Sequence, residues 1–366
     1  MDGWAPPPGG AGLTPPRETF PIVAGRPGEV KAAVLHGVGR VRVESVADPR
    51  PGPEEALLRI RACGVCGTDN SLYKGDYPGA YPVVIGHELA GEVLEVGSAV
   101  KGLSAGQRVT VDPNKVCHAC PYCRAGLEHL CENVSSMGVH RDGADAEYCV
   151  MPAANVYPLP DSLSFEEAAF SEPLACAVHG VDLAGVRLGD TVLIVGGGPM
   201  GNLITQCALR AGAATVVVSE PIAGRRELAA AHGATHLLDP ARQDLGQEMR
   251  KIRRIGADVV FEAAGNPAAQ AACLALARKG GTVMFFGVSP QDRMIQVNPF
   301  LINENELRIL GSYNNPFATA RAVQLLVSGA VRVGDLISHR LSLKDYLEVF
   351  RLFGGPDTMK LMVRMD

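Results

Sequence analysis

The sequence predicts an α/β protein with two domains, one rich in β-strands and one built on a parallel sheet. Residues 30–160 contain short strand-like runs that Gly and Pro interrupt, without a long helical pattern. From about residue 175, strand-like runs alternate with helical stretches, as in βαβ units. A chain of 366 residues is also long for a single hydrophobic core. We therefore expect two domains that meet near residue 175.

The individual elements follow from the same patterns. In the first domain, strands are expected at residues 30–35, 41–46, 55–62 and 91–96. In the second domain, we expect strands at 191–195, 215–219, 257–261 and 282–287 and helices at 201–211, 225–232 and 268–277. A further helix is expected at 318–328. Residues 1–29 contain Pro-rich runs that supply few backbone hydrogen bonds, so we expect a flexible N-terminal extension there.

The composition excludes several classes of protein. Hydrophobic residues make up 47% of the chain and charged residues 20%, as in soluble globular proteins. The net charge is -5 and the positive residues are scattered, so we expect no nucleic-acid partner. No apolar run approaches the roughly 20 residues that span a bilayer, and the N-terminus lacks the pattern of a signal peptide. Ten cysteines without a secretion signal favour a cytoplasmic, metal-binding protein over a disulfide-bonded one.

A glycine-rich turn predicts a dinucleotide site. The apolar run 191–195 is followed by G-x-G-x-x-G at Gly196, Gly198 and Gly201, with Pro199 and Met200 opening the next helix. Glycines allow the tight turn, the approach of a pyrophosphate and close helix packing, and the helix N-terminus attracts phosphate charge. This context of strand, turn and helix predicts a doubly wound, Rossmann-type domain.

The choice between NAD and NADP depends on the end of the second strand of this domain. Glu220 follows Gly201 by 19 residues, where a carboxylate accepts hydrogen bonds from the adenosine ribose and repels a 2′-phosphate. Arg225 and Arg226 lie close in sequence and could hold a 2′-phosphate instead. The residues favour NAD, with NADP as the alternative.

Four closely spaced cysteines predict a structural metal site. Cys117, Cys120, Cys123 and Cys131 supply four thiolates within 15 residues. Four soft ligands in one loop suit tetrahedral structural zinc and leave no coordination position for chemistry. His118 and His129 lie inside this loop, and we expect them on the surface, because the cysteines already complete the ligand set.

A second set of possible ligands is dispersed along the sequence, and a family resemblance joins its members. Gly86-His87-Glu88-x-x-Gly91, together with the four-cysteine loop and the glycine turn, resembles the zinc-containing medium-chain dehydrogenases over residues 30–366. Cys66-Gly67-Thr68-Asp69 also matches that family. Glu172 in Ser-Glu-Pro-Leu resembles the sorbitol and threonine dehydrogenase branch.

The resemblance implies an architecture for the whole chain. A GroES-like, β-rich catalytic zinc domain would comprise residues 30–174 and 314–366, and the Rossmann domain residues 175–313. The nicotinamide would lie in a cleft between them. A homodimer or homotetramer is expected from the same resemblance.

The resemblance also assigns catalytic roles. Cys66 and His87 would bind a catalytic zinc, and either Glu88 or Glu172 would supply the carboxylate. Thr68 matches the hydroxyl residue that contacts the substrate oxygen. In the mechanism that this implies, zinc polarises a secondary alcohol, NAD accepts hydride, and Thr68 or Glu172 handles the proton. We expect Asp69 to orient His87 rather than to act directly.

The substrate is the least determined feature. Cys66-Gly67-Thr68-Asp69-x-Ser71-x-Tyr73-Lys74-Gly75 is similar to the 2-deoxy-scyllo-inosamine dehydrogenases of aminoglycoside antibiotic biosynthesis, which oxidise an aminocyclitol. Asn314 stands near the position of a substrate-facing arginine in sorbitol dehydrogenases, so the polyol contacts must differ. Tyr73 and Asn314 are the candidate substrate residues. Amino-alcohol oxidation of the L-threonine 3-dehydrogenase kind and a non-enzymatic zinc-binding protein remain alternatives.

Overall fold

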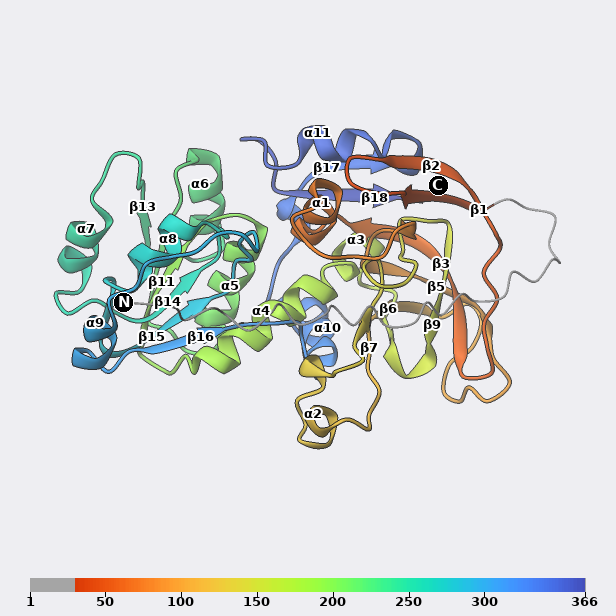
Figure 1. Cartoon of the computed structure of the whole chain (residues 1–366), viewed down its shortest axis with the longest axis horizontal. Helices are drawn as coiled ribbons and strands as arrows, with labels where there is room; N and C mark the ends of the chain where they lie inside the picture. Colours follow the sequence, from red (N-terminus) through yellow and green to blue (C-terminus); the bar gives the residue numbers. More distant parts are fainter. Residues whose placement is uncertain (1–29, 366) are drawn as a thin grey trace, which may run out of the picture.

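The computed structural model describes residues 30–365, and the two predicted structural types lie side by side along its long axis (Figure 1). The expected flexible extension, residues 1–29, lies outside the described residues. The helices are α1 (Gly67–Lys74), α2 (Pro121–Arg124), α3 (Phe165–Ala168), α4 (Ser171–Ala184), α5 (Pro199–Arg210), α6 (Ala223–Ala231), α7 (Leu245–Ile252), α8 (Pro267–Cys273), α9 (Pro299–Glu304), α10 (Thr319–Val327) and α11 (Glu348–Leu352).

The β-rich part contains a seven-stranded and a three-stranded sheet. The larger sheet has the order β10-β6-β5-β3-β18-β17, and β9 also pairs with β3. Its strands are β3 (Glu55–Gly64), β5 (Glu88–Val96), β6 (Arg108–Val111), β9 (Tyr148–Pro152), β10 (Val156–Pro158), β17 (Ile337–Ser342) and β18 (Lys360–Arg364). The smaller sheet has the order β2-β1-β4, with β1 (Val30–Leu35), β2 (Val41–Val46) and β4 (Val83–Val84).

Two long strands carry the chain to the predicted metal ligands. β3 extends two residues beyond its expected end, to Gly64, and β5 begins at Glu88, three residues before its expected start. The two strands pair antiparallel with Gly64 opposite Glu88. On the other side of β3, Met362 of β18 lies opposite Gly64. Residues far apart in the sequence therefore converge at one end of this sheet.

The second part is a six-stranded parallel sheet of order β13-β12-β11-β14-β15-β16, which confirms the predicted fold class. Its strands are β11 (Thr191–Val195), β12 (Thr215–Ser219), β13 (His236–Leu238), β14 (Ala257–Glu262), β15 (Ala277–Phe285) and β16 (Arg308–Gly311). β15 begins five residues before the expected strand because Ala277 already pairs with Ala257. Helix α8 is correspondingly shorter than expected.

Helix α4 connects the two parts. It begins at Ser171, so the expected boundary near residue 175 falls inside a buried helix. Ten of its 14 residues are buried, and Gly185, in the left-handed conformation, ends the helix. Below α4 in Figure 1, the four-cysteine loop forms a lobe with α2, closed at its neck by the short strands β7 (Asn114–Lys115) and β8 (Ser135–Ser136).

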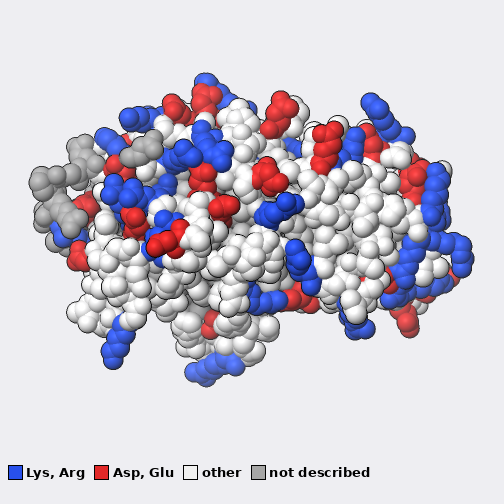
Figure 2. Space-filling view, turned by 180° about the vertical axis from the view of Figure 1, so that it is seen from behind, with Lys and Arg blue, Asp and Glu red and all other residues white. Residues whose placement is uncertain are grey.

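The surface charges and the helix lengths are relevant to the predictions about nucleic acid and membranes. Positive and negative side chains are interspersed along the upper part of the face shown in Figure 2. Within residues 30–365, the helices are too short or too polar to cross a membrane.

Candidate metal and dinucleotide site

The start of helix α1 places the first candidate ligand. Cys66 is the N-cap of α1, and the Asp69 carboxylate accepts a hydrogen bond from the Cys66 backbone N–H through Oδ2, at 2.8 Å. An acidic side chain in the first turn also interacts favourably with the helix dipole. The Thr68 Oγ1 atom lies 3.6 Å from the Cys66 sulfur. Local helix capping therefore fixes Cys66, Thr68 and Asp69 relative to one another.

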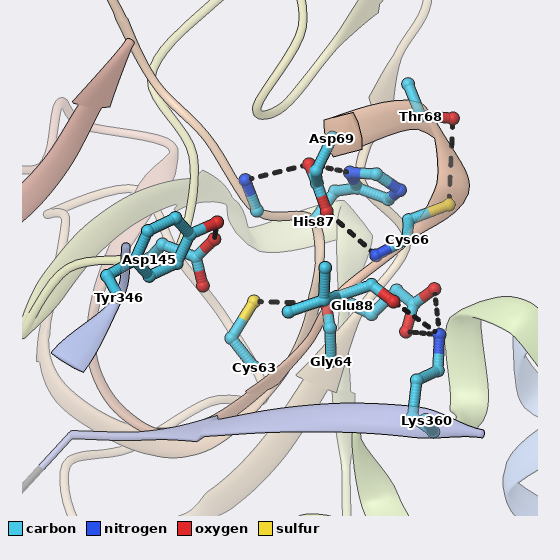
Figure 3. A network of polar contacts seen from close by, with 12 residues as sticks. Cys63, Gly64, Cys66, Thr68, Asp69, His87, Glu88, Asp145, Tyr346 and Lys360 are labelled. Carbon is cyan, nitrogen blue, oxygen red and sulfur yellow. Dashed lines mark hydrogen bonds and ion pairs between the residues drawn. The ribbon is translucent and has the colours of Figure 1, made fainter. Parts of the chain in front are cut away.

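His87 is held against the same helix. Its Nδ1 lies 3.6 Å from Asp69 Oδ1, which also accepts a hydrogen bond from the Gly86 N–H at 3.4 Å. Only glycine fits at position 86, because φ is 91° and a Cβ would lie 2.6 Å from Cγ of Asp145. Figure 3 shows the Asp69 carboxylate in contact with both the Cys66 backbone and the His87 ring. The other ring nitrogen, Nε2, is left available for a ligand.

The donor atoms of Cys66, His87 and Glu88 all lie within 4.8 Å of one another. Burial alone lowers the pKa of His87, but Asp69 and Cys66 raise it well above its ordinary value. The surroundings of the imidazole therefore favour a positive charge. One thiolate, one imidazole and one carboxylate form the kind of donor set that binds catalytic zinc and leaves a position open, so these residues fit the metal.

Glu88 has a buried counter-ion that the sequence did not indicate. Lys360 Nζ lies 2.6 Å from Glu88 Oε1 and 2.5 Å from Oε2, and it also donates to the Val65 carbonyl at 3.0 Å. Both side chains are at least 95% buried. Figure 3 shows Lys360 reaching Glu88 from β18. Glu88 is thus shared between the metal-ligand group and a fixed cation.

Glu172, the second candidate carboxylate, lies in the first turn of α4. Oε1 is 3.5 Å from the Cys176 sulfur and 3.5 Å from Nδ2 of Asn315. Burial raises the pKa of Glu172 to about 7, although His87 opposes the shift. The structure does not bring Glu172 into the group of donors within 4.8 Å. A buried carboxyl that titrates near neutrality is suited to proton transfer.

The two candidate substrate residues have different surroundings. The Tyr73 ring stacks on Phe350, with centroids 3.9 Å apart, and packs against the core. Asn314 adopts φ 55°, and its buried Nδ2 has no hydrogen-bond partner among residues 30–365. An unsatisfied buried donor is expensive unless a ligand satisfies it, so Asn314 remains the stronger candidate.

Tyr77 is a further residue at the site. Burial, then the neighbouring Tyr313, then the charge of Cys66 raise the pKa of the Tyr77 phenol. The phenol therefore stays protonated, and it forms a hydrogen bond with Tyr313.

The four-cysteine lobe has the expected composition of a structural zinc site. The sulfur atoms of its cysteines form one group within 4.8 Å, and a four-thiolate set fits zinc. Backbone N–H groups already point at the sulfurs, including Cys120 N–H to Cys117 and Asn133 N–H to Cys131, both at 3.3 Å. Such donors stabilise thiolates and lower the pKa of Cys117 to about 6.

The two histidines of the lobe differ. His118 is on the surface, as expected, and pairs with Glu128 at 2.9 Å. His129 was also expected on the surface, and it is partly exposed. It is half-buried, because its ring packs edge-on against His179 of α4, with centroids 5.1 Å apart.

The glycine turn lies between β11 and α5, the strand–turn–helix arrangement that the sequence predicts. Gly198 is the N-cap of α5, Pro199 is its first residue and Met200 its second. A Cβ on Gly201 would lie 1.9 Å from the Gly196 carbonyl, so helix and turn approach too closely for any other residue. A Cβ on Gly198 would meet nothing within 4 Å, so this glycine faces open space. The backbone there can be approached by a phosphate group.

Glu220 lies against this turn, whereas the nearby arginines point elsewhere. The Glu220 carboxylate accepts hydrogen bonds from Gly197 N–H at 2.8 Å and Ile222 N–H at 2.9 Å. Arg225 donates to the carbonyls of Gly355 and Thr358, at 2.9 and 2.8 Å. Arg226 pairs with Asp239 at 3.1 Å and bonds to the Glu220 carbonyl. The structure gives each arginine partners inside the protein.

Sequence reasoning missed the residues that support the ligands from a distance. Lys360, Asn315, Tyr77 and Asp145 belong to no motif, and nothing in their local sequence indicates the metal ligands. Asp145 is fully buried and accepts a hydrogen bond from the Tyr346 hydroxyl at 2.6 Å (Figure 3). Only a three-dimensional contact reveals such residues.

Two protein-family models match the chain. Residues 52–161 match the alcohol dehydrogenase GroES-like domain, and residues 199–328 match the zinc-binding dehydrogenase domain. Sorbitol dehydrogenase of Bacillus subtilis is 35% identical over 87% of this chain and 92% of its own length. L-threonine 3-dehydrogenase of Pyrococcus horikoshii is 38% identical over 89% of this chain and 95% of its own length.

Solved structures agree with these matches. A protein assigned as a zinc-binding dehydrogenase from Sinorhizobium meliloti 1021, solved with NADP, is 42% identical, with a TM-score of 0.90 over 92% of this chain and 100% of its own. An alcohol dehydrogenase from E. coli CFT073, solved with NADH, is 27% identical, with a TM-score of 0.86 over 92% of this chain and 99% of its own.

Proposed function

We propose that this chain, which belongs to the zinc-containing medium-chain dehydrogenases, oxidises a secondary alcohol to a ketone with NAD as the acceptor. The family assignment makes it a zinc-dependent NAD(P) dehydrogenase of alcohols or polyols. The proposed substrate is a polyol, cyclitol or aminocyclitol. The observation that carries this proposal is the convergence of Cys66, His87 and Glu88 within 4.8 Å. These donors come from the ends of two paired strands in a protein that also has a dinucleotide turn.

The residues divide the chemistry among themselves. Bound zinc supplies Lewis acidity, which lowers the pKa of a hydroxyl group that it contacts. Cys66 and His87 would hold the metal, and the Asp69 carboxylate, 3.6 Å from Nδ1, would orient the His87 ring. Thr68 accepts the hydrogen bond of the substrate hydroxyl from its place beside Cys66. Glu172, with a pKa of about 7, takes the proton.

The two carboxylates have separate roles in this proposal. Glu88 completes the ligand group, within reach of the other two donors, and Lys360 limits its freedom to move. Glu172 uses Oε1 for both Cys176 and Asn315, which leaves Oε2 for a proton or a water at the metal. Glu172 would be the alternative carboxylate for the metal if Glu88 stayed with Lys360.

NAD is the proposed cofactor because of Glu220. Its buried carboxylate lies at the glycine turn, where it would accept the ribose hydroxyls and repel a 2′-phosphate. Arg225 and Arg226 are engaged by protein groups and are not free to bind that phosphate. The relative solved with NADP makes the parallel test with NADP essential.

The proposed substrate is uncharged at the reacting end. Asn314 offers a buried amide donor, and Tyr77 a neutral phenol, both suited to hydroxyl groups. An aminocyclitol of the kind used in aminoglycoside antibiotic biosynthesis is the narrowest form of the proposal, and it rests on the Cys66-to-Gly75 motif.

L-Threonine is the second candidate, because several relatives at 36–38% identity are L-threonine 3-dehydrogenases. A threonine carboxylate needs a positive partner in the pocket. Lys360, the cation that lies against the metal ligands, is already paired with Glu88. This pairing disfavours threonine relative to a polyol.

We further propose a homodimer or homotetramer joined through the parallel sheet. β16 is an end strand of that sheet, with one edge unpaired among the described residues. Nearby in the sequence, Met294 and Phe300 are exposed by 90% and 67%. Light scattering of the purified protein measures the subunit number, and a monomer at micromolar concentration would contradict this proposal.

The deciding experiment follows NADH formation by absorbance, with zinc-loaded enzyme and a panel of cyclitols, aminocyclitols, linear polyols and L-threonine. NADP is tested in parallel. Turnover of cyclitols, aminocyclitols or linear polyols with NAD supports the proposal, and a preference for aminocyclitols supports its narrowest form. Turnover of L-threonine alone, or a preference for NADP, would contradict it.

A further inference from the structure

A chain of hydrogen bonds joins the four-cysteine lobe to the candidate proton acceptor. We define the lobe as residues 114–136, the segment closed by β7 and β8. The Ser136 hydroxyl donates to Oδ1 of Asn114 at 2.7 Å, and Nδ2 of Asn114 donates to Oδ1 of Asn315 at 3.0 Å. Nδ2 of Asn315 then donates to Oε1 of Glu172 at 3.5 Å. The chain runs from the neck of the lobe to the first turn of α4.

The direction of this chain is fixed by its chemistry. The carboxylate of Glu172 only accepts, so Asn315 must present its NH₂ group to it. The carbonyl of Asn315 then faces Asn114, which must donate, and the carbonyl of Asn114 accepts from Ser136. Reversing either amide would oppose two donors or two acceptors. Asn315 is only 1% exposed, so bulk water cannot replace a lost partner.

A second contact between the lobe and α4 lies two helical turns further on. Glu172, Cys176 and His179 are spaced four and three residues apart and so share one face of α4. The His179 ring meets the His129 ring of the lobe edge-on, with centroids 5.1 Å apart. The lobe therefore reaches one face of α4 at two places, through Asn315 at Glu172 and directly at His179.

Asn114 is held from two sides, because its backbone N–H and Nδ2 both donate to Asp112 Oδ1, at 2.9 and 3.1 Å, and the metal-binding loop follows it. Its strand β7 is only two residues long, and it pairs with β8 through Asn114–Ser136 and Lys115–Ser135. The chain between the two strands carries the four cysteines. A hairpin this short has little stability of its own, so the folded loop holds it together.

We propose that Asn315 and Asn114 are positioning residues that fix the Glu172 carboxylate, and that the folded four-cysteine lobe acts on the catalytic centre through them. The lobe then does more than stabilise its own segment of the chain. This inference rests on the proposed role of Glu172 but not on the identity of the alcohol.

The test compares Asn315→Ala, Asn114→Ala and the double variant with the parent enzyme, each also in a Glu172→Gln background. Asn298→Ala is the matched control, because Asn298 caps α9 by accepting from Phe300 N–H at 3.0 Å and takes no part in the chain. Positioning residues around a metal site typically change activity by about 10–100-fold. We measure kcat, KM, NADH affinity by fluorescence and the visible absorption of the enzyme with cobalt at the catalytic site.

The expected result is a fall in kcat of about tenfold or more in Asn315→Ala and a smaller fall in Asn114→Ala, with NADH affinity unchanged. The double variant should be no worse than Asn315→Ala alone, and Glu172→Gln should remove the effect of both. The cobalt absorption should shift in the Asn315 variant and not in the control.

Additive losses in the double variant, or an Asn315→Ala effect that persists undiminished in the Glu172→Gln background, would overturn the inference. So would unchanged kcat and cobalt absorption in Asn315→Ala. If the alcohol panel fails, the cobalt absorption and hydrogen exchange of residues 171–184 still compare the variants without substrate. Failure of the substrate proposal is then distinct from failure of this one.

Discussion

Lys360 and Glu88 form an ion pair in which Nζ lies 2.6 Å from Oε1, with both side chains almost completely buried. The pair joins the start of β18 to the start of β5, strands that flank β3 on opposite sides. It therefore ties the C-terminal strand to the candidate metal ligands.

Lys360→Met should destabilise the protein, because it leaves the Glu88 carboxylate buried without its counter-ion. Breaking a buried pair in this way costs about 3–5 kcal/mol. Urea unfolding at pH 7 measures the loss. The double variant Lys360→Met/Glu88→Gln should recover much of it, since no unpaired charge remains. A Lys360→Met variant as stable as the parent would show that Glu88 finds another partner.

Cys66→Ser and His87→Ala should each abolish turnover while leaving NAD affinity nearly unchanged. These side chains lie at the candidate metal site and not at the glycine turn. Metal analysis should show one zinc per chain lost, and NADH fluorescence titration should give a dissociation constant close to that of the parent. An equal loss of NADH affinity would instead indicate that both residues support the fold.

Cys120→Ser should act on stability first. The four sulfurs form one group, and each supports a lobe with few other internal contacts. We expect one zinc fewer per chain and a lower unfolding temperature, followed by scanning calorimetry and metal analysis. Ser104→Ala, remote from both cysteine groups in sequence, serves as the control. A Cys120→Ser protein with full zinc content would contradict the assignment.

Glu220→Gln should weaken the preference for NAD. The amide keeps one acceptor oxygen for the two backbone N–H groups that the carboxylate bonds, and it loses the charge that repels a 2′-phosphate. A hydrogen bond to a charged group contributes roughly 1.5–3 kcal/mol, so the ratio of kcat/KM for NAD over NADP should fall by about tenfold or more. Arg225→Lys should leave this ratio unchanged, because Arg225 bonds to the C-terminal segment. The opposite ranking of the two variants would contradict the proposed roles.

Asp258 makes the free energy of unfolding depend on pH in the acid range. Burial raises its pKa, but Arg278, the Thr191 N–H and Arg253 together bring the pKa below its ordinary value. Because the folded pKa is lower than the unfolded one, the stabilisation is present above about pH 4 and is lost as the pH falls through the folded value. Asp258→Asn should therefore be less stable than the parent at pH 7, and the difference should shrink below about pH 4. Urea unfolding from pH 3 to 7 checks this, and a difference independent of pH would contradict it.

The sequence by itself determined the features that depend on residues close together along the chain. Gly196 to Gly201 and the four cysteines lie in short segments, so their spacing alone constrains their geometry. Strand and helix alternation determined the parallel sheet, because periodicity is a local property. Cys66 and His87 were joined only through a family resemblance.

Tertiary structure alone decided which distant residues complete the site. Lys360 meets Glu88 across 272 positions of sequence, and Asn315 meets Glu172 across 143. Neither partner has a pattern that marks the other, since their contact arises from the pairing of β18 with β3 and from the return of the chain after β16. It also packs the His129 ring against His179 of α4. Local sequence thus identifies the types of ligand residue. Their charges, orientation and supporting hydrogen bonds depend on long-range packing, and no local pattern encodes that packing.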